Sequence, residues 1–308
     1  MSLNIYQNKS LIKRINELLG YSLDVDDDSL LEILKNANKE YWFNYMTLEK
    51  DFYLTVLLHY ICNNIKSINF KGWTCLNKWY FPYFRLSEDL DFMVCYENHP
   101  WKNERIRFAR EIRNQVVHIA DTLWWSLNPE DQQHKRALWN NFLKNKKHTY
   151  LKYIFTYPSL INWENQTIKL EVTYTQKQYL PSNSVIIHDI YKDLIFNKPL
   201  FKEEKINCVA IEEMMAEKLR ACVSRREPAI RDFYDIRFIL EKTNITLDNI
   251  KPLFEEKIKE NTWDFTIYNW YPILEKQIKL NLLPMLWESW TKFNLKETYD
   301  KIINFIKV

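Results

Sequence analysis

Glycine is rare in this chain, and this scarcity limits how its backbone can fold. Only 2 of the 308 residues are glycine and 10 are proline, so few positions suit tight turns or left-handed backbone conformations. The sequence therefore favours long helices joined by few sharp turns. One glycine, Gly72, lies in the stretch FKGWTCLNKWYFPYFRLSEDLDF, which runs from Phe70 to Phe92 and contains Asp89 and Asp91 near its end.

The composition is that of a soluble globular protein of one or two domains. Hydrophobic residues make up 46% and charged residues 27% of the chain, as in ordinary globular domains. The net charge of +3 is too small to indicate nucleic-acid binding by itself. The aromatic share of 16% favours a large aromatic core, and surfaces that stack on nucleobases are the alternative.

The cysteines and the apolar segments exclude several classes of protein. The five cysteines are scattered and contain no C-x-x-C pair, which argues against a disulfide framework and against a structural zinc site. Residues 1–20 are polar and charged, so we expect no signal peptide. No apolar run reaches the roughly 18 residues that a membrane span needs. We therefore expect a cytoplasmic protein with no membrane partner.

Hydrophobic periodicity predicts strands in the middle of the chain and helices towards both ends. Some segments repeat apolar residues at helical spacing, and others alternate with a period of two. Strands flanked by helices indicate an α+β or mixed α/β core. We predict helices over 4–19, 28–38, 47–65 with Thr47 as N-cap, 75–79, 101–146 and most of the chain from 209 onwards, and strands over 67–71, 89–96, 167–174 and 184–190.

Asp89 and Asp91 are the residues that most directly suggest a chemistry. Side chains at i and i+2 of a strand point to the same face, so the two carboxylates lie close together. These like charges repel each other, and a divalent cation that prefers oxygen ligands, such as Mg²⁺, relieves the repulsion. A pair of such ions can activate a hydroxyl group and stabilise a departing pyrophosphate. The alternative is that SEDLD forms a solvated acidic edge.

The segment before the acid pair predicts a phosphate-binding turn. The predicted strand SINFK leads into Gly72 and Thr74, and then into the predicted short helix. Glycine lets the backbone approach a ligand closely, and free N–H groups at the start of a helix attract phosphate. A phosphate cradle beside metal-binding carboxylates is the arrangement that nucleotidyl transfer needs.

The stretch from Phe70 to Phe92 is similar to the signature of the AbiEii/AbiGii-type toxin nucleotidyltransferases. That family, which includes the MenT toxins, is a branch of the DNA-polymerase-β-like superfamily. Its pattern reads aromatic-Lys-Gly-Gly-Thr/Ser, then a spacer, then Arg-Phe-Ser-Glu-Asp-hydrophobic-Asp. The preceding LEKDFYLTVLL and the later AEKLRACVSRREPAIRDFYDI also resemble family blocks, so the resemblance covers 46–96 and 210–240. The matching residues in the signature include Gly72, Thr74, Arg85, Ser87, Asp89 and Asp91.

One departure from the family pattern is Trp73, which stands where the family has its second glycine. A bulky side chain at this position narrows the phosphate pocket, stacks on a base, or marks a catalytically weakened member. The first two interpretations are compatible with an active enzyme, whereas the third favours a non-catalytic nucleotide- or RNA-binding protein that retains the fold.

The resemblance implies a fold and a function. The fold is a polymerase-β-like nucleotidyltransferase core with a mixed β-sheet over 47–240, with helical regions over 1–46 and 241–308. The function is metal-dependent transfer of a nucleoside monophosphate from an NTP to an acceptor, with Mg²⁺ or Mn²⁺ as the cofactor. The family implies an RNA acceptor, with tRNA as the best candidate, and a toxin that has a cognate antitoxin protein or acts in phage defence.

The resemblance also implies roles for residues of the signature. Asp89 and Asp91 bind the metal, while Gly72, Thr74 and Ser87 contact the nucleotide. A third carboxylate on a neighbouring strand usually completes a two-metal site. Glu171, on the polar side of TIKLEVTY, is the candidate, and an exposed glutamate paired with Lys169 is the alternative.

The later block contains a lysine on the apolar stripe of a predicted helix. Lys218 recurs at helical spacing with Ile211, Met215 and Cys222, and a lysine that faces inward needs an anionic partner. The resemblance makes that partner the triphosphate of the nucleotide. The alternative is that the side chain extends to a nearby glutamate.

Two further residues of this block have roles that the resemblance suggests. Asp232 belongs to the family's Arg-Asp-x-x-Asp motif and orients Lys218, whereas helix capping is the alternative. Asp235 is assigned to an i, i+4 ion pair with Arg231. Arg225 matches a family position, but its role is open.

Two segments combine basic and aromatic residues, the helix predicted over 101–113 and the stretch 134–148. This combination suits an RNA backbone and unstacked bases, and solvated helix faces are the alternative. If the acid pair is only a surface feature, the chain is a structural protein without a nucleotide site.

Overall fold

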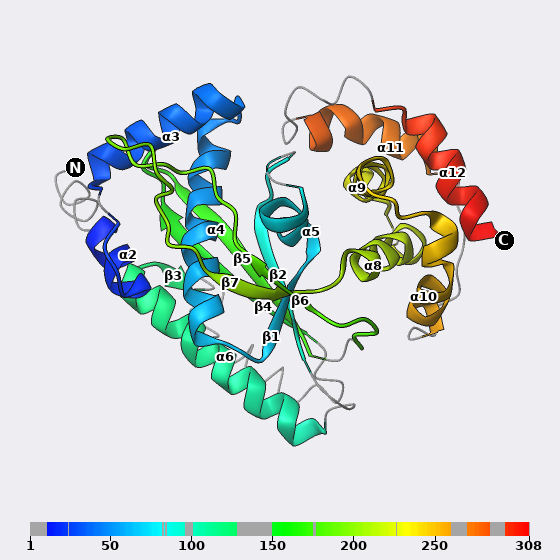
Figure 1. Cartoon of the computed structure of the whole chain (residues 1–308), viewed down its shortest axis with the longest axis horizontal. Helices are drawn as coiled ribbons and strands as arrows, with labels where there is room; N and C mark the ends of the chain where they lie inside the picture. Colours follow the sequence, from blue (N-terminus) through cyan, green and yellow to red (C-terminus); the bar gives the residue numbers. More distant parts are fainter. Residues whose placement is uncertain are drawn as a thin grey trace. The chain divides into compact units, whose positions relative to one another are not determined.

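The structure is a computed structural model of the chain, which divides into two compact units. The first unit comprises Met1–Lys177 and Ser182–Cys208, and the second comprises Gln178–Pro181 and Val209–Val308. The structure describes residues 11–23, 25–81, 83, 85–95, 101–127, 150–174, 177–225, 227–259, 270–283 and 293–307. Figure 1 shows the elements in chain order.

The two units group the chain differently from the predicted division into 1–46, 47–240 and 241–308. The helices before residue 46 belong to the same unit as the sheet, and the helices from residue 209 onwards belong to the other unit. The extent of the nucleotidyltransferase core over 47–240 therefore stays a prediction.

The described part of the first unit contains one seven-stranded sheet, in the order β3-β4-β5-β2-β1-β7-β6. The pairs β2–β5 and β1–β7 are parallel, and the other neighbouring pairs are antiparallel. The sheet is thus mixed, and the predicted α+β class is confirmed. The strands are β1 (Ile68–Lys71), β2 (Asp89–Val94), β3 (Ser126–Leu127), β4 (Tyr150–Pro158), β5 (Asn165–Thr173), β6 (Asn183–Ile186) and β7 (Lys205–Cys208).

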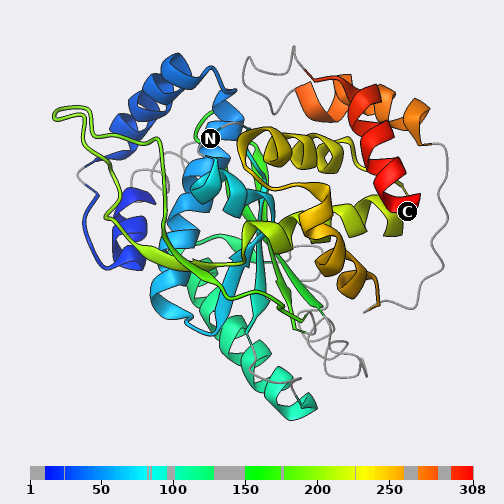
Figure 2. The same ribbon diagram turned by 45° about the vertical axis from the view of Figure 1, so that its right-hand side comes forward.

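Helices α4 and α6 pack on the sheet and contact each other (Figures 1 and 2). α4 is buried along most of its length, and its Tyr53 ring lies 4.7 Å from the ring of Tyr157 on β4. Apolar side chains such as Leu90, Phe92 and Leu170 form the buried face of the sheet, which leaves Asp89 and Asp91 on the opposite face. The helices of this unit are α2 (Leu11–Leu19), α3 (Asp27–Tyr41), α4 (Tyr45–Asn64), α5 (Gly72–Cys75), the π-helical η1 (Leu76–Tyr80) and α6 (Lys102–Leu123).

A buried lysine links the segment after Gly72 to α4 by hydrogen bonds. Lys78 of η1 is 1% exposed, and its ammonium group donates to Asp51 at 2.7 Å, to Thr55 at 2.8 Å and to the hydroxyl of Tyr83 at 2.7 Å. All three N–H bonds of the lysine therefore find acceptors, which a buried ammonium group requires. The network fixes the position of the helix that follows Gly72.

The structure corrects the predicted lengths of several elements. The short helix begins at Gly72 rather than at 75 and continues as η1 to Tyr80. The side chain of Asn44, not Thr47, caps α4 by accepting the N–H of Met46. The strand predicted over 184–190 ends at Ile186.

The helix predicted over 101–146 is too long. α6 ends at Leu123, where Trp124 takes a left-handed conformation with φ of 58°. The strand β4 was missed, although its buried residues alternate along YLKYIFTYP with a period of two. The basic stretch 134–148 lies outside the described residues.

The described residues of the second unit are mostly helical, as predicted. A buried ion pair joins Lys257 of α10 to Glu213 of α8 at 2.6 Å, and Glu213 also accepts the backbone N–H groups of Tyr179 and Leu180. These bonds explain why 178–181 groups with the helices. The helices are α8 (Ile211–Ser224), α9 (Ile230–Lys242), α10 (Leu247–Lys259), α11 (Tyr271–Gln277), the π-helical η3 (Ile278–Leu282) and α12 (Leu295–Lys307).

No helix in the described ranges is both long enough and apolar enough to cross a bilayer.

His59 gives the fold a testable dependence on pH. The ring is fully buried, it stacks on Phe201 at 4.9 Å, and neither nitrogen has a hydrogen-bond partner among the described residues. Burial, with a smaller contribution from the charge of Lys78, lowers the pKa of His59 to about 4. The unfolded chain therefore binds a proton more readily than the folded protein between pH 6.5 and 4, so this residue lowers stability as the pH falls through that range.

We expect His59→Leu to remove this loss. The free energy of unfolding of the wild type should fall relative to that of the variant by about 3 kcal/mol between pH 7 and pH 4. Urea unfolding at several pH values measures this difference. Asp189, whose pKa burial raises to about 6, contributes the opposite slope to both proteins, so it cancels in the comparison. Parallel pH curves for the two proteins would contradict the assignment.

Candidate active site

The structure places the predicted site residues in two groups. Gly72, Thr74, Ser87, Asp89, Asp91 and Glu171 lie in the first unit, and Lys218 and Asp232 lie in the second. Within each group the residues are neighbours.

Gly72 is required by the close approach of Asp91. The glycine has a φ of 74°, and a Cβ atom added to it would lie 3.0 Å from the Cβ of Asp91 and would overlap its carboxylate. The antiparallel pairing of β1 and β2 brings the two strands together here, with Lys71 opposite Asp91. Because glycine has no side chain, the Asp91 carboxylate can lie directly against the backbone of Gly72. The predicted contact of Gly72 with phosphate stays a prediction.

Thr74 and Ser87 fix Asp89 at its backbone and at its side chain. The buried hydroxyl of Thr74 donates to the backbone carbonyl of Asp89. The hydroxyl of Ser87 donates to the Asp89 carboxylate at 3.0 Å. These bonds position the acid pair, and they are contacts that the sequence did not reveal. The nucleotide contacts predicted for both residues remain predictions.

Glu171 lies beside Asp91 in the parallel pair of β2 and β5. Residues paired in this way point to the same face of the sheet, so three carboxylates share one region of the polar face. The Glu171 side chain is 27% exposed, and its carboxylate lies 3.5 Å from the ammonium group of Lys152 on β4. Glu171 therefore forms its ion pair with Lys152, whereas the alternative prediction had named Lys169.

The three carboxylates fit a hard divalent cation by their donor type. Mg²⁺ and Mn²⁺ prefer carboxylate oxygens, and the absence of a side chain at Gly72 leaves room for the Asp91 carboxylate beside β1. In the conformation that the structure shows, no three His, Cys, Asp or Glu side chains of the described ranges form a group that could hold a metal ion.

The indole ring of Trp73 packs against the guanidinium group of Arg85. The indole is 5% exposed and the Arg85 side chain is 2% exposed, and the guanidinium carbon lies 3.3 Å from the ring centroid. This geometry is a cation–π contact. The face of the indole is thus covered by Arg85, which removes the structural reason for interpreting Trp73 as a base-stacking residue.

In the second unit, Lys218 forms ion pairs with two aspartates of α9. Its ammonium group lies 2.6 Å from the Asp235 carboxylate and 3.4 Å from that of Asp232, and Arg225 also pairs with Asp232. The anionic partner that the sequence required is therefore present within the protein. The side chain of Asp235 is fully buried, and its ion pair with Lys218 is a contact that the sequence analysis missed.

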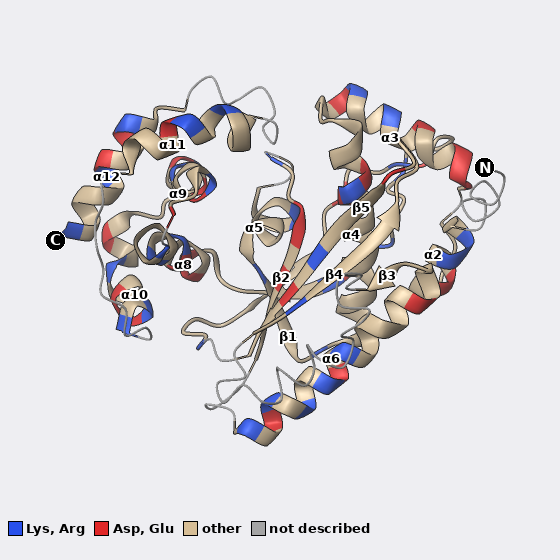
Figure 3. Ribbon diagram, turned by 180° about the vertical axis from the view of Figure 1, so that it is seen from behind, with Lys and Arg blue, Asp and Glu red and all other residues tan. Residues whose placement is uncertain are grey.

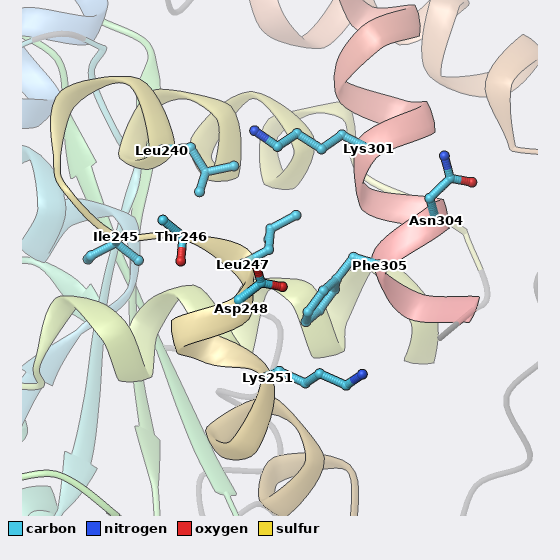
Figure 4. A pocket seen from close by; sticks show the side chains of 9 residues that line it. All are labelled: Leu240, Ile245, Thr246, Leu247, Asp248, Lys251, Lys301, Asn304 and Phe305. Carbon is cyan, nitrogen blue, oxygen red and sulfur yellow. The ribbon is translucent and has the colours of Figure 1, made fainter.

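The second unit also contains a surface pocket of about 570 Å³ between α9, α10 and α12 (Figure 4). Apolar side chains such as Leu240 and Phe305 line it together with Lys251 and Lys301. None of the predicted site residues lies among the lining residues.

The chain is similar to one protein family over most of its length. The family of nucleotidyl transferase AbiEii toxins from type IV toxin–antitoxin systems matches residues 65–300. This match places the chain among the nucleotidyltransferases. The chain belongs to the AbiEii toxin family, and the predicted family, fold class and enzyme class are confirmed.

Two solved structures from Helicobacter pylori resemble the chain at low identity. JHP933 shares 17% identity with a TM-score of 0.49, and the match covers 86% of this chain and 92% of that chain. A protein provisionally assigned as a nucleotidyltransferase shares 18% identity with a TM-score of 0.48, over 86% of this chain and 95% of that chain. No curated protein sequence matches this chain.

The two glycines offer a matched test of the contact between Gly72 and Asp91. Gly20 and Gly72 have φ values of 73° and 74°, but a Cβ atom at Gly20 would have no neighbour within 4 Å. Gly20→Ala should cost about 1–2 kcal/mol of unfolding free energy for its left-handed backbone alone. Gly72→Ala should cost clearly more and abolish activity, because the methyl group displaces the Asp91 carboxylate.

Urea unfolding and nucleotidyl-transfer assays on both variants measure these effects. The double variant Gly72→Ala/Asp91→Ala should recover part of the lost stability, since it removes the overlapping carboxylate. Equal losses of stability in the two single alanine variants would show that the contact with Asp91 is not the constraint.

Proposed function

We propose that this nucleotidyltransferase uses a divalent cation, Mg²⁺ or Mn²⁺, to transfer a nucleoside monophosphate from an NTP to RNA, with tRNA as the best candidate acceptor. The observation that carries the proposal is the placement of three carboxylates on the polar face of the sheet. Asp89 and Asp91 share that face of β2, and Glu171 lies beside Asp91 on β5.

The three carboxylates would hold the cation. When bound, the cation would neutralise charge on the triphosphate and favour ionisation of the acceptor hydroxyl. Ser87 holds the Asp89 carboxylate in place, and Gly72 leaves the Asp91 carboxylate its space. Glu171, at the register position next to Asp91, is suited to face the acceptor hydroxyl.

The phosphates would be bound by backbone and by lysine. α5 begins at Gly72, and the N–H groups of its first turn would donate to phosphate oxygens, as N–H groups at helix starts do. Lys218 would bind the triphosphate, with Asp232 and Asp235 holding its ammonium group in position. Catalysis would then come mainly from positioning and charge neutralisation.

RNA is supported by basic residues in the first unit. α6 carries Arg105, Arg107, Arg110 and Arg113, and Figure 3 shows basic positions recurring along this helix. Arginine side chains suit a phosphate backbone. A cognate antitoxin protein is the other proposed partner, since the family is that of toxin–antitoxin systems, and both partners are consistent with action in the cytoplasm.

Incubation with each α-labelled NTP, Mg²⁺ and total tRNA tests the proposal. We expect label on RNA with the wild type, and a loss on the order of 100-fold or more for Asp89→Asn and Asp91→Asn. Asp121→Asn, at an exposed position of α6, is the matched control and should keep full activity. Omission of the divalent cation should abolish labelling.

Two results would contradict the proposal. Label on the protein in place of RNA would show that the acceptor is a polypeptide. Undiminished labelling by Asp89→Asn and Asp91→Asn would show that these carboxylates are not the site of transfer.

A further inference from the structure

Each of the three proposed metal-binding carboxylates has a lysine directly opposite it on a neighbouring strand. This arrangement follows from the register of four adjacent strands, β1, β2, β5 and β4. Register partners point to the same face, with Cβ atoms about 5 Å apart. The pairs are Lys71 with Asp91, Lys169 with Asp89, and Lys152 with Glu171.

The charges of these six residues balance. Three carboxylates alone would attract a divalent cation strongly, whereas the positive charges of lysines at the opposite register positions weaken that attraction. The repulsion is greater for a divalent ion than for a monovalent one, because the Coulomb energy scales with the product of the charges. Figure 3 shows acidic and basic positions within the strands of this sheet.

Glu171 is the carboxylate whose lysine contact is defined most clearly. Its carboxylate lies 3.5 Å from the ammonium group of Lys152, and the two side chains are 27% and 36% exposed. Both groups are therefore accessible, so the ion pair can open without a rearrangement of the core. An ion pair this exposed contributes little to stability, so Glu171 can exchange Lys152 for another partner.

Tyr150, two residues before Lys152 on β4, lies on the same face of that strand as Lys152. The phenol is 45% exposed, and burial together with the charge and hydrogen bond of Glu171 raises its pKa above the usual range. The contact that holds the carboxylate proposed as the third metal ligand is thus the ion pair with Lys152.

We propose that Lys152 is a positioning residue, which holds Glu171 in the nucleotide-free enzyme and releases it when a metal ion and an NTP bind together. The triphosphate supplies the negative charge that offsets the lysines, so the metal ion binds well only with its nucleotide. This ordered binding rests on the metal-dependent transfer proposed above. It would keep the site from taking up a cation before the substrate arrives.

Binding of Mn²⁺ to the full chain, measured by calorimetry or by the electron paramagnetic resonance of free Mn²⁺, tests the proposal. Without nucleotide, Lys152→Met should bind Mn²⁺ about tenfold more tightly than the wild type, because one repelling charge is gone. With a non-hydrolysable NTP analogue the two proteins should differ much less. Lys152→Arg should behave as the wild type.

Lys192→Met is the matched control. Lys192 forms a comparable ion pair with Glu40 at 3.3 Å, with side chains 37% and 50% exposed, and its loss should leave Mn²⁺ binding unchanged. Adding Glu171→Gln to Lys152→Met should remove the gain in affinity, which ties the effect to this carboxylate.

The possible failures are distinguishable. If the wild type binds Mn²⁺ with nucleotide but Lys152→Met matches it in the absence of nucleotide, the role of Lys152 is wrong and the proposed function stands. If the wild type binds no Mn²⁺ even with the analogue, both are overturned. Equal gains in Lys152→Met and Lys192→Met would show a general charge effect and would also overturn the role of Lys152.

Discussion

The contact between Gly72 and Asp91 is the constraint on which the rest of the site depends. A glycine with a left-handed φ lets β1 turn into α5 directly beside the Asp91 carboxylate, where any other residue would overlap it. The turn then places Thr74 to bond the backbone of Asp89. In a chain with only 2 glycines, this one serves the geometry of the acid pair.

Lysine–carboxylate pairs with little solvent exposure support the functional segments in both units. Lys78 joins the helix after Gly72 to Asp51 of α4, and Lys218 joins α8 to Asp235 of α9. Burying such charges is costly unless every donor finds an acceptor, so these pairs tolerate few alternative arrangements. Lys152 and Glu171 differ, because their pair is partly exposed and can exchange partners. The pairs of Lys78 and Lys218 thus hold backbone segments in place, whereas the pair of Lys152 and Glu171 can exchange partners at the proposed metal site.

The sequence predicted those parts of the fold and site that depend on local pattern. The alternation around Asp89, the strand containing Glu171 and the helices after residue 209 were found because periodicity shows them directly. The register of β2 on β5, which puts Glu171 beside Asp91, depends on pairing between distant segments and could only be proposed. The contact between Trp73 and Arg85 could not be predicted from the family pattern, because that pattern has a glycine at position 73. The sequence did contain a signal for the buried partner of Lys78, because Asp51 is a charged residue within a predicted helix that is otherwise mostly apolar.

A crystal structure with Mn²⁺ and a non-hydrolysable NTP analogue would show whether Asp89 and Asp91 bind the metal ion and the nucleotide. We expect an anomalous peak for Mn²⁺ at coordination distance from carboxylate oxygens of Asp89 and Asp91, with the triphosphate on the same ion. A manganese ion and a nucleotide bound away from these two aspartates would show that the acid pair is not the site of nucleotidyl transfer.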